Sequence, residues 1–321
     1  MRDEGNESMT SKDVGWGIHV VDTGFQRDNM AACYVVEDAG EVAIIETGTK
    51  DTVPRLFEFF EQQGITPEQV KYVIVTHVHL DHAGGAGLLM QQLPNTTFVV
   101  HEKGARHMVD PAKLQAGATA VYGKVEFDRT YGDLVPIDKD VMKIPVDEEV
   151  LTLGGRRLTF IDTPGHARHH FCIFDDKSQG FFTGDTFGLA YQELTTRKGP
   201  FIIPTTTPVQ FDPVALKQSI KRIISYNPQR VFLTHYGMVE QPEVLSEVLL
   251  SRVDKYVEIA QKNADNPNRL QGIMEDIMAF FLEELAMHDC VLSKDDIVTA
   301  LRVDAMLNAQ GLDVWLSSLA K

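Results

Sequence analysis

Cysteine is scarce in this chain, which has three among its 321 residues. Cys33, Cys172 and Cys290 are odd in number and far apart, so they provide no disulfide framework and suit a reducing compartment. Long apolar runs are missing too, and no stretch is long and apolar enough to cross a membrane. Residues 1–8 are polar and acidic and lack the apolar core of an export signal. We therefore expect a cytoplasmic protein with no membrane partner.

Basic residues are in the minority, because 46 Asp and Glu stand against 30 Lys and Arg and give a formal net charge of −16. Proteins that recognise a phosphate backbone need clustered Lys and Arg. The composition therefore opposes nucleic-acid binding, and we expect a small-molecule substrate instead. A chain of this length can bury a large core, which fits one long domain with a helical appendage.

Histidines, by contrast, crowd into residues 76–82, whose sequence is Thr-His-Val-His-Leu-Asp-His. The apolar run 72–75 that precedes them predicts a buried strand. Side chains alternate between faces in extended chain, so His77 and His79 would project to one side and could hold one ion between them.

The second half of this segment predicts another group of ligands. Asp81 would continue the alternation, whereas His82 would break it as the small residues 83–87 turn the chain into a helix over 88–92. One strand end would thus offer ligands to two adjacent positions. Imidazole together with carboxylate suits Zn²⁺, Fe or Mn better than Ca²⁺ or Mg²⁺, which prefer oxygen alone.

Three later segments repeat one pattern, in which a candidate metal ligand follows the end of an apolar strand. They are 160–166, which ends in Pro-Gly-His, 181–185, which ends in Asp, and 231–235, which ends in His. An open sheet would gather such strand ends along one rim. We therefore expect His166, Asp185 and His235 to complete the site begun by residues 76–82.

This arrangement resembles the metallo-β-lactamase superfamily, whose pattern is HxHxDH followed by a distal His, an Asp and a final His. All seven positions are filled here. The resemblance covers roughly the first 240 residues and implies an α/β fold, the αββα sandwich, in which two mixed sheets lie face to face with helices outside. It thus implies a catalytic domain over 1–240 and leaves 241–321 as a C-terminal helical region.

The resemblance also implies a set of metal ligands. By it, one metal ion is bound by His77, His79 and His166, a second by Asp81, His82 and His235, and Asp185 bridges the two. The cofactors would be two divalent ions, Zn²⁺ first, with Fe or Mn as alternatives that the same ligands accept. Glu46 is a departure, since the family usually has an Asp there that supports the ligands from behind. The longer acid could still reach, but its carboxylate would lie elsewhere.

Other segments fit the architecture. Beyond residue 240, apolar residues recur at helical spacing over 244–257 and 273–285, and Ser293 opens a third helix. Such stripes pack against the catalytic domain or form a homodimer interface, and in other branches of the superfamily this region shapes the substrate mouth. Upstream we predict hairpins over 32–45, 151–160 and 171–182 and helices over 53–60 and 213–225, the last capped by Asp212.

Three further residues are candidates for substrate binding. His170 lies four residues after a proposed ligand, where thioester- and lactone-cleaving relatives often have a second histidine, so it would contact substrate or support a ligand. Tyr191 and Tyr236 follow two other ligands and could donate to a substrate oxyanion, although a packed tyrosine is the commoner case. We expect His169 to be exposed and residues 105–140 to form a cap.

The expected chemistry follows from two metal ions about 4 Å apart. A water that bridges them has its pKa lowered toward neutrality, so hydroxide is available as a nucleophile. Asp81 would orient it, and the second ion or a tyrosine would stabilise the oxyanion at the attacked carbonyl. We therefore expect hydrolysis of an ester-like bond, with a thioester or lactone favoured.

Relatives with all seven ligands include glyoxalase II thioesterases, acyl-homoserine lactonases, phosphodiesterases and PqsE-like proteins. Secreted β-lactamases with two zinc ions lack the bridging acid and fit less well. Two other functions stay open. One is a non-haem diiron protein that binds or reduces oxygen, although such relatives usually have Glu in place of His79. The other is a metal-bearing regulatory binding module whose turnover is incidental.

Overall fold

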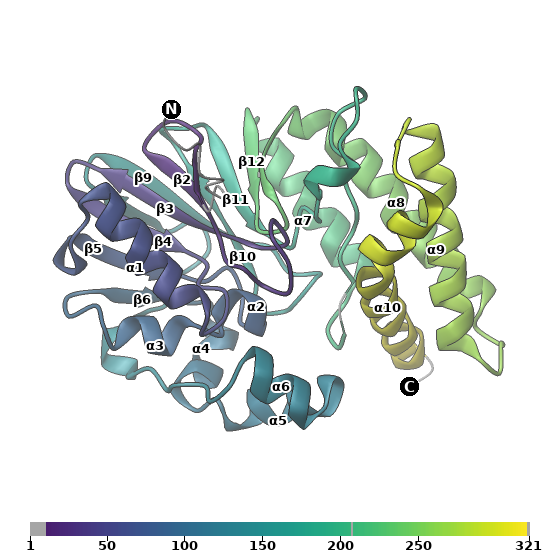
Figure 1. Cartoon of the computed structure of the whole chain (residues 1–321), viewed down its shortest axis with the longest axis horizontal. Coiled ribbons are helices and arrows are strands. Elements are labelled where there is room, and N and C mark those ends of the chain that lie inside the picture. The colour runs from purple at the N-terminus through teal and green to yellow at the C-terminus, as the bar shows by residue number, and fades with distance from the viewer. Residues whose placement is uncertain (1–10, 207, 320–321) are drawn as a thin grey trace, which may run out of the picture.

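Two β-sheets packed face to face form the centre of the protein, and helices cover both outer faces (Figure 1). The computed structural model describes residues 11–206 and 208–319, without the side chains of 121 and 122. Residues 1–8, on which the expectation about export rests, lie outside this description. The predicted αββα sandwich is confirmed.

The first sheet contains seven strands in chain order, antiparallel from β1 to β4 and parallel from β4 to β7. They are β1 (Ser11–Asp13), β2 (Ile18–Asp22), β3 (Ala32–Asp38), β4 (Glu41–Ile45), β5 (Val70–Ile74), β6 (Thr97–Val99) and β7 (Met142–Lys143). The predicted β3–β4 hairpin is present, with Asp38 opposite Glu41. β5 is the buried strand that was expected before the histidine segment.

The second sheet has the order β13-β12-β11-β10-β9-β8 and is antiparallel except between β11 and β12. Its strands are β8 (Val150–Leu153), β9 (Arg156–Asp162), β10 (Phe171–Asp175), β11 (Gly180–Gly184), β12 (Arg230–Leu233) and β13 (Gly237–Glu240). The two hairpins predicted here, β8–β9 and β10–β11, are both confirmed. The parallel β11–β12 pair brings the ends of two ligand-bearing strands to the same edge.

Helix α7 (Pro213–Ser225) begins where the local sequence predicts it. Asp212 Oδ1 accepts hydrogen bonds from the backbone of Val214 and Ala215, at 2.9 and 3.0 Å, and so caps the predicted helix α7. The helices are α1 (Thr52–Gln63), α2 (Leu80–Ala83), α3 (Ala86–Met90), α4 (Glu102–Val109), α5 (Ala112–Tyr122), α6 (Lys124–Thr130), α7 (Pro213–Ser225), α8 (Pro242–Lys262), α9 (Arg269–Met287) and α10 (Lys294–Leu319). Short 3₁₀ turns occupy Pro67–Gln69, Lys139–Val141 and Gln192–Leu194.

Apolar side chains from both sheets fill the space between them. Tyr34 of β3 packs edge-on against Phe182 and Phe232 of the second sheet, and its hydroxyl donates a 2.5 Å hydrogen bond to the carbonyl of Leu233. This contact ties the first sheet to the end of β12, which leads directly into His235. The packing of the sandwich therefore fixes the position of a candidate ligand.

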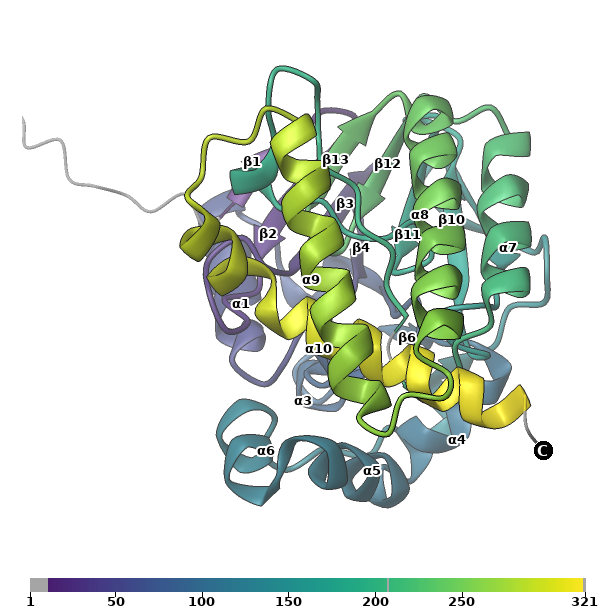
Figure 2. The same ribbon diagram turned by 90° about the vertical axis from the view of Figure 1, so that its right-hand side faces the viewer.

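The three C-terminal helices belong to the same body as the second sheet. Leu249 of α8, Ile277 of α9 and Ala305 of α10 share one buried cluster with Ile161 and Val231 of the sheet. In Figure 2, α10 runs across the lower ends of α8 and α9, and it packs against both. The predicted helices are confirmed, and packing against the catalytic part is observed. The boundary at residue 240 and a homodimer stay predictions. None of the helices described here is both long and apolar enough to span a bilayer.

Candidate metal centre

The histidine segment leaves β5 and enters helix α2 after a short turn. His79 is the N-cap residue of α2, which begins at Leu80, so Asp81 and His82 lie in a helical turn. The prediction of extended chain through Asp81 is therefore wrong, because the helix begins before the small residues and not after them. A Cβ on Gly85 would meet carbonyl oxygens of the loop after β4 at 2.6 and 2.7 Å, which explains the close approach of the two segments.

The structure brings all seven predicted ligands together. They arrive from the β5–α2 turn, the β9–β10 loop, the end of β11 and the end of β12. Three overlapping groups have ligand atoms within 4.8 Å of one another: His77, His79 and His166; His77, His82 and Asp185; and Asp81, His82 and His235. The rim of strand ends expected from the sequence is thus present.

Separations within the cluster fit tetrahedral coordination. Two ligands about 2.0–2.1 Å from one ion are roughly 3.3 Å apart at a tetrahedral angle. His79 Nδ1 lies 2.9 Å from His77 Nε2 and 3.1 Å from His166 Nε2. Around the second position, His235 Nε2 lies 3.3 Å from Asp81 Oδ2, and His82 Nε2 lies 3.3 Å from Asp185 Oδ1. The other Asp185 oxygen lies 3.4 Å from His166 Nε2, so this carboxylate faces both groups.

Two atoms at the centre of the cluster also point to a bound cation. His82 Nε2 and Asp185 Oδ1 are buried and have no hydrogen-bond partner. Buried polar groups are normally paired, because an unpaired one loses its hydration without compensation. A divalent ion between the two atoms would satisfy both, and the residues present therefore fit the metal ions that the sequence pattern implies.

The ring nitrogens that face away from the cluster are held by other groups. His77 Nδ1 lies 3.1 Å from Thr76 Oγ1, and His166 Nδ1 lies 3.1 Å from Thr205 Oγ1. His235 Nδ1 donates to the carbonyl of Met30 at 2.7 Å. Such contacts orient an imidazole ligand and fix which nitrogen faces the metal.

The three-histidine group is kept neutral. Burial lowers the pKa of His77 and His79 well below the usual value, and nearby imidazoles add to the effect. Burial also lowers the pKa of His166, although Asp185 opposes this. Neutral imidazole is the form that binds a metal, so this half of the site needs no deprotonation near pH 7.

In the other half of the site, the histidine pKa values are raised in the absence of metal. Burial disfavours a charge on His82, but the carboxylates of Asp81, Asp185 and Glu46 outweigh it and raise its pKa well above the usual value. For His235 too, burial is outweighed by Asp185 and Asp81, and the pKa is raised. A metal ion at this position would therefore replace protons.

A mainly apolar cleft of about 300 Å³ opens over the cluster. His79, Asp81 and Asp185 lie at its base, and its walls come from the segment 105–140, the 208–210 loop and α10. Leu114 and Ala118 of α5 and Leu307 of α10 are among the wall residues. The expected cap is thus formed by α4, α5 and α6, and a C-terminal helix does shape the mouth.

A second, smaller hollow of about 60 Å³ lies on the His235 side of the cluster. Tyr191, Asp304 and Asn308 line it, together with Asp81, Asp185 and Leu307, which also line the apolar cleft. We call this hollow the polar chamber after the buried Asp304 and Asn308 in its wall, although apolar residues such as Leu189 line it too. The candidate ligands therefore lie between two hollows, and the smaller one has these two buried polar side chains in its wall.

The three residues predicted to bind substrate lie in different surroundings. His170 is fully buried, lines neither space, and accepts a hydrogen bond at Nε2 from the backbone N–H of Asp185 at 3.2 Å. That contact favours support of a ligand over contact with substrate. Tyr191 lines the polar chamber, but its hydroxyl donates to Asp304 Oδ1 at 3.1 Å. Tyr236 lines a separate hollow with Val20 and Met238.

The exposure predicted for His169 is wrong. It is 7% exposed and lines the apolar cleft, with its ring stacked at 6.1 Å from that of His77. Burial lowers the pKa of His169 to about 4. His169 shares the wall of this cleft with cap residues such as Leu114, and the local sequence does not specify that neighbourhood.

Helix α10 contributes two buried polar residues that were not predicted from the sequence. Asp304 and Asn308 are 7% and 3% exposed and interrupt an otherwise apolar buried stripe, one helical turn apart. Burial raises the pKa of Asp304 to about 6, against the opposing effects of His235 and the hydrogen bond from Tyr191. Two polar residues within an apolar stripe were the available signal.

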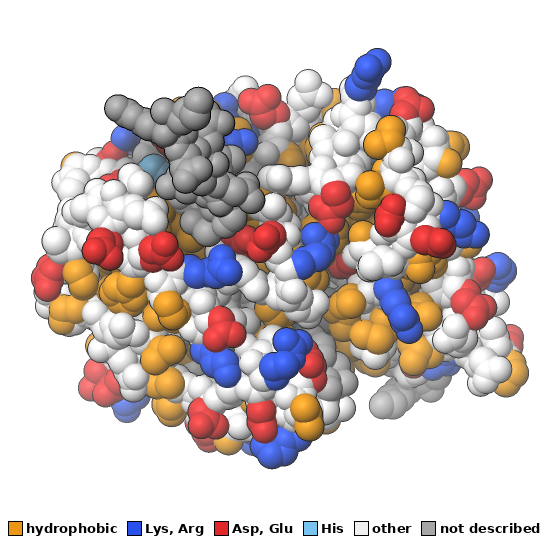
Figure 3. Space-filling view, in the orientation of Figure 1, with side chains coloured by type: hydrophobic (Ala, Val, Ile, Leu, Met, Phe, Trp, Pro, Cys, Tyr) orange, Lys and Arg blue, Asp and Glu red, His pale blue; other side chains and the backbone are white. Residues whose placement is uncertain are grey.

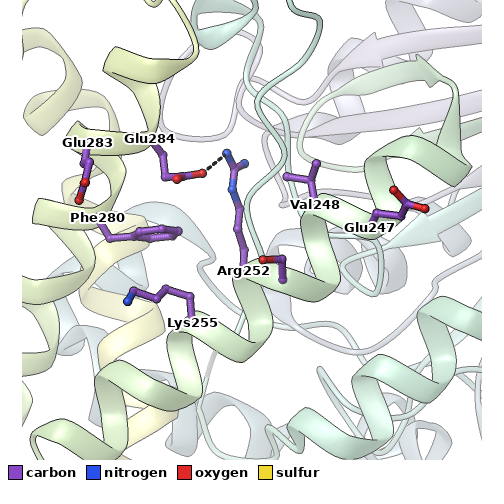
Figure 4. A pocket seen from close by; sticks show the side chains of 8 residues that line it. Glu247, Val248, Arg252, Lys255, Phe280, Glu283 and Glu284 are labelled. Carbon is purple, nitrogen blue, oxygen red and sulfur yellow. Dashed lines mark hydrogen bonds and ion pairs between the residues drawn. The ribbon is translucent and has the colours of Figure 1, made fainter.

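A further hollow of about 620 Å³ lies away from the cluster, between α8 and α9 (Figure 4). Arg252 crosses it to Glu284 at 3.1 Å and stacks on Phe201 at 3.9 Å, so it joins the helical layer to the 188–208 loop. Elsewhere, the face in Figure 3 has acidic and basic side chains interspersed.

Known proteins resemble this chain over most of its length. A family profile for the metallo-beta-lactamase superfamily matches residues 27–235. The metallo-beta-lactamase fold-containing protein ST1585 of Sulfurisphaera tokodaii is 30% identical over 256 residues, 78% of this chain and 88% of that protein. N-acyl homoserine lactonase AttM of Azorhizobium caulinodans is 32% identical over 107 residues, 33% of this chain and 36% of that protein.

Solved structures of metallo-beta-lactamase superfamily proteins also resemble this chain. An archaeal metallo-beta-lactamase superfamily protein, ST1585 from Sulfolobus tokodaii, superposes with a TM-score of 0.64 at 25% identity, covering 93% of this chain and 98% of that one. The metallo-beta-lactamase family protein TTHA1429 from Thermus thermophilus shares the fold with a TM-score of 0.66 at 18% identity, covering 95% and 94%. The chain therefore belongs to the metallo-beta-lactamase superfamily, a superfamily of metal-dependent hydrolases.

Proposed function

We propose that this protein hydrolyses an ester-like bond, a thioester or a lactone, in a small molecule with an apolar acyl group. The observation that carries the proposal is the position of His79, Asp81 and Asp185 at the base of a mainly apolar cleft of about 300 Å³. Pockets for small molecules combine apolar walls with a few convergent polar groups in this way. The partial similarity to a lactonase supports the same class of bond.

The proposed cofactors are two divalent ions, Zn²⁺ first. One ion would be held by His77, His79 and His166, and the other by Asp81, His82 and His235. Asp185 would contact both ions. Ions bound there would supply Lewis acidity and make a water molecule more acidic.

The chain's own residues would position the reactants. Asp81 lines both spaces and would orient the attacking water through its carboxylate. The walls of the apolar cleft would hold the acyl group and exclude bulk water from the carbonyl. Tyr191 is not the proposed oxyanion donor, because its hydroxyl is bonded to Asp304.

The test is hydrolysis by metal-free protein reloaded with Zn²⁺ alone, in the absence of oxygen. A screen of acyl thioesters, lactones and phosphodiesters should show turnover of a thioester or lactone that needs no redox partner, and metal-free protein is the control. Absence of turnover, together with rapid oxygen consumption by the iron-loaded protein, would favour the diiron function and reject the hydrolase.

A further inference from the structure

One buried face of α10 is apolar except where it passes the candidate metal centre. Leu301, Ala305 and Leu312 are fully buried on this face, and Asp304 and Asn308 lie between them. Both polar residues line the polar chamber. A carboxyl group is costly to bury, so its presence in an apolar stripe calls for a partner.

Asp304 has a partner for one carboxylate oxygen only. The Tyr191 hydroxyl donates to Oδ1 at 3.1 Å, whereas Oδ2 is buried and accepts no hydrogen bond. Of the side-chain atoms described around the polar chamber, one other is buried without a hydrogen-bond partner, Asp185 Oδ1, and the proposed metal site would satisfy it.

The buried donors around the polar chamber are directed elsewhere, and Gln26, which also lines it, is exposed. The Thr205 hydroxyl donates to the backbone carbonyl of Asp185 at 2.9 Å, and the Asn308 amide donates to the Tyr256 hydroxyl at 3.4 Å. The Tyr191 hydroxyl is already bonded to Asp304. The unused buried group that remains is therefore an acceptor, and a ligand that fills this space has to bring a donor.

We propose that Asp304 binds the substrate, with its Oδ2 accepting a hydrogen bond from an N–H or O–H group beside the scissile carbonyl. The inference rests on the proposed hydrolase function. The polar chamber and the apolar cleft share Asp81, Asp185 and Leu307 as wall residues. A carbonyl over the cluster would thus have its acyl chain in the cleft and its donor in the chamber, whose volume of about 60 Å³ suits a small polar group.

The experiment compares two substrates, one with the donor and one in which a methyl group replaces the donor hydrogen. They are an α-acylamino-γ-lactone and its N-methyl analogue, with the corresponding pair of thioesters, and the protein is the full chain loaded with Zn²⁺. A site built around a hydrogen bond to a charged group discriminates strongly against an analogue that lacks the donor. We expect kcat/KM to favour the N–H form by about 10- to 100-fold. Equal rates on both members of each pair would overturn the inference while leaving the hydrolase function intact.

Variants assign the preference to one residue. Asp304→Asn keeps an oxygen that can accept from Tyr191 but replaces the free acceptor with an amide donor. Asp304→Ala removes the carboxylate and adds no donor. Each should lower kcat/KM for the N–H form by about 10-fold or more and leave the N-methyl form nearly unchanged. Asp295→Asn makes the same chemical change at an exposed position of α10 and should retain the preference. Equal losses on both forms would mean that Asp304 has a structural role only.

A binding measurement separates this inference from the proposed function. Calorimetry with the ring-opened N-acylamino acid and its N-methyl analogue should show about 10-fold or more tighter binding of the N–H form. Such a preference without turnover of any substrate would support the Asp304 site and reject the hydrolase. Equal affinities would reject the Asp304 site whether or not the variants fold.

Discussion

Glu46 Oε1 lies 3.2 Å from Nδ1 of His82, and both side chains are buried. The ring N–H is not aligned for a hydrogen bond, so the contact is chiefly one of charge. Glu46 is itself held by Thr76, whose hydroxyl and backbone N–H lie 2.5 and 3.2 Å from its two oxygens. The longer acid therefore does reach the back of a candidate ligand, and it joins the end of β4 to the turn after β5.

Glu46→Gln should weaken metal binding without unfolding the protein. The amide keeps the size of the side chain but removes the negative charge behind His82, and loss of such a support typically costs 10–100-fold in metal affinity. Competition with a chromophoric chelator measures the affinity. Glu58→Gln is the matched control, since Glu58 is exposed on α1. Unchanged affinity in Glu46→Gln would show that the contact does not support the ligand.

Asp185→Asn should lower metal content and hydrolysis together. The carboxylate faces both ligand groups, at 3.3 Å from His82 and 3.4 Å from His166, and an amide lacks the charge that two cations would share. The metal content of the dialysed protein should fall below two ions per chain, while its circular dichroism spectrum stays like that of the wild type. Full metal content with near-normal activity would contradict the bridge.

Metal uptake should release protons near pH 7. The raised pKa values of His82 and His235 mean that the metal-free fold favours the charged form of these rings, and a metal can bind only after they lose the proton. Affinity should therefore increase with pH until both rings are neutral in the metal-free protein. Calorimetry in buffers of different ionisation enthalpy counts the released protons, and a heat that is independent of the buffer would argue against charged histidines.

The same raised pKa values determine how the metal-free protein responds to pH. Groups whose pKa is higher in the folded state stabilise the fold fully below the unfolded value, near 6.5, and this contribution is lost as pH rises through the folded pKa. The melting temperature of the metal-free wild type should therefore decrease as pH rises above 6.5. In His82→Gln this decrease should be smaller. An unaltered pH profile would place the pKa of His82 near its ordinary value.

Leu114→Trp should select against long acyl chains. Leu114 lines the apolar cleft from α5, and the larger ring would fill part of its volume of about 300 Å³. We expect kcat/KM to fall about 10-fold or more for long-chain substrates, with little change for acetyl esters. Val125→Trp on α6, where the native side chain is 85% exposed, is the control for a tryptophan on the same cap. A uniform loss over all chain lengths would argue against an acyl site here.

Local features of this fold can be predicted from short stretches of the chain. Strand β5, the three hairpins and the Asp212 cap follow from residues close together in the chain, because apolar runs, turns and caps act within a few positions. The seven candidate ligands are spread over residues 77–235 and were predicted from four strand ends and the family pattern that they match. The start of α2 was misplaced, since packing against the loop after β4 tightened a turn that the glycines alone do not fix.

The residues that lie opposite the buried side of a helix depend on how the layers pack in three dimensions. An amphipathic stripe states which side of a helix is buried but not what lies opposite. Asp304 meets Tyr191 across 113 residues of chain, and His169 is buried in a cleft that it shares with residues of the cap. Such contacts depend on how whole layers pack, so the ligands could be predicted from the sequence while the two spaces beside them could not.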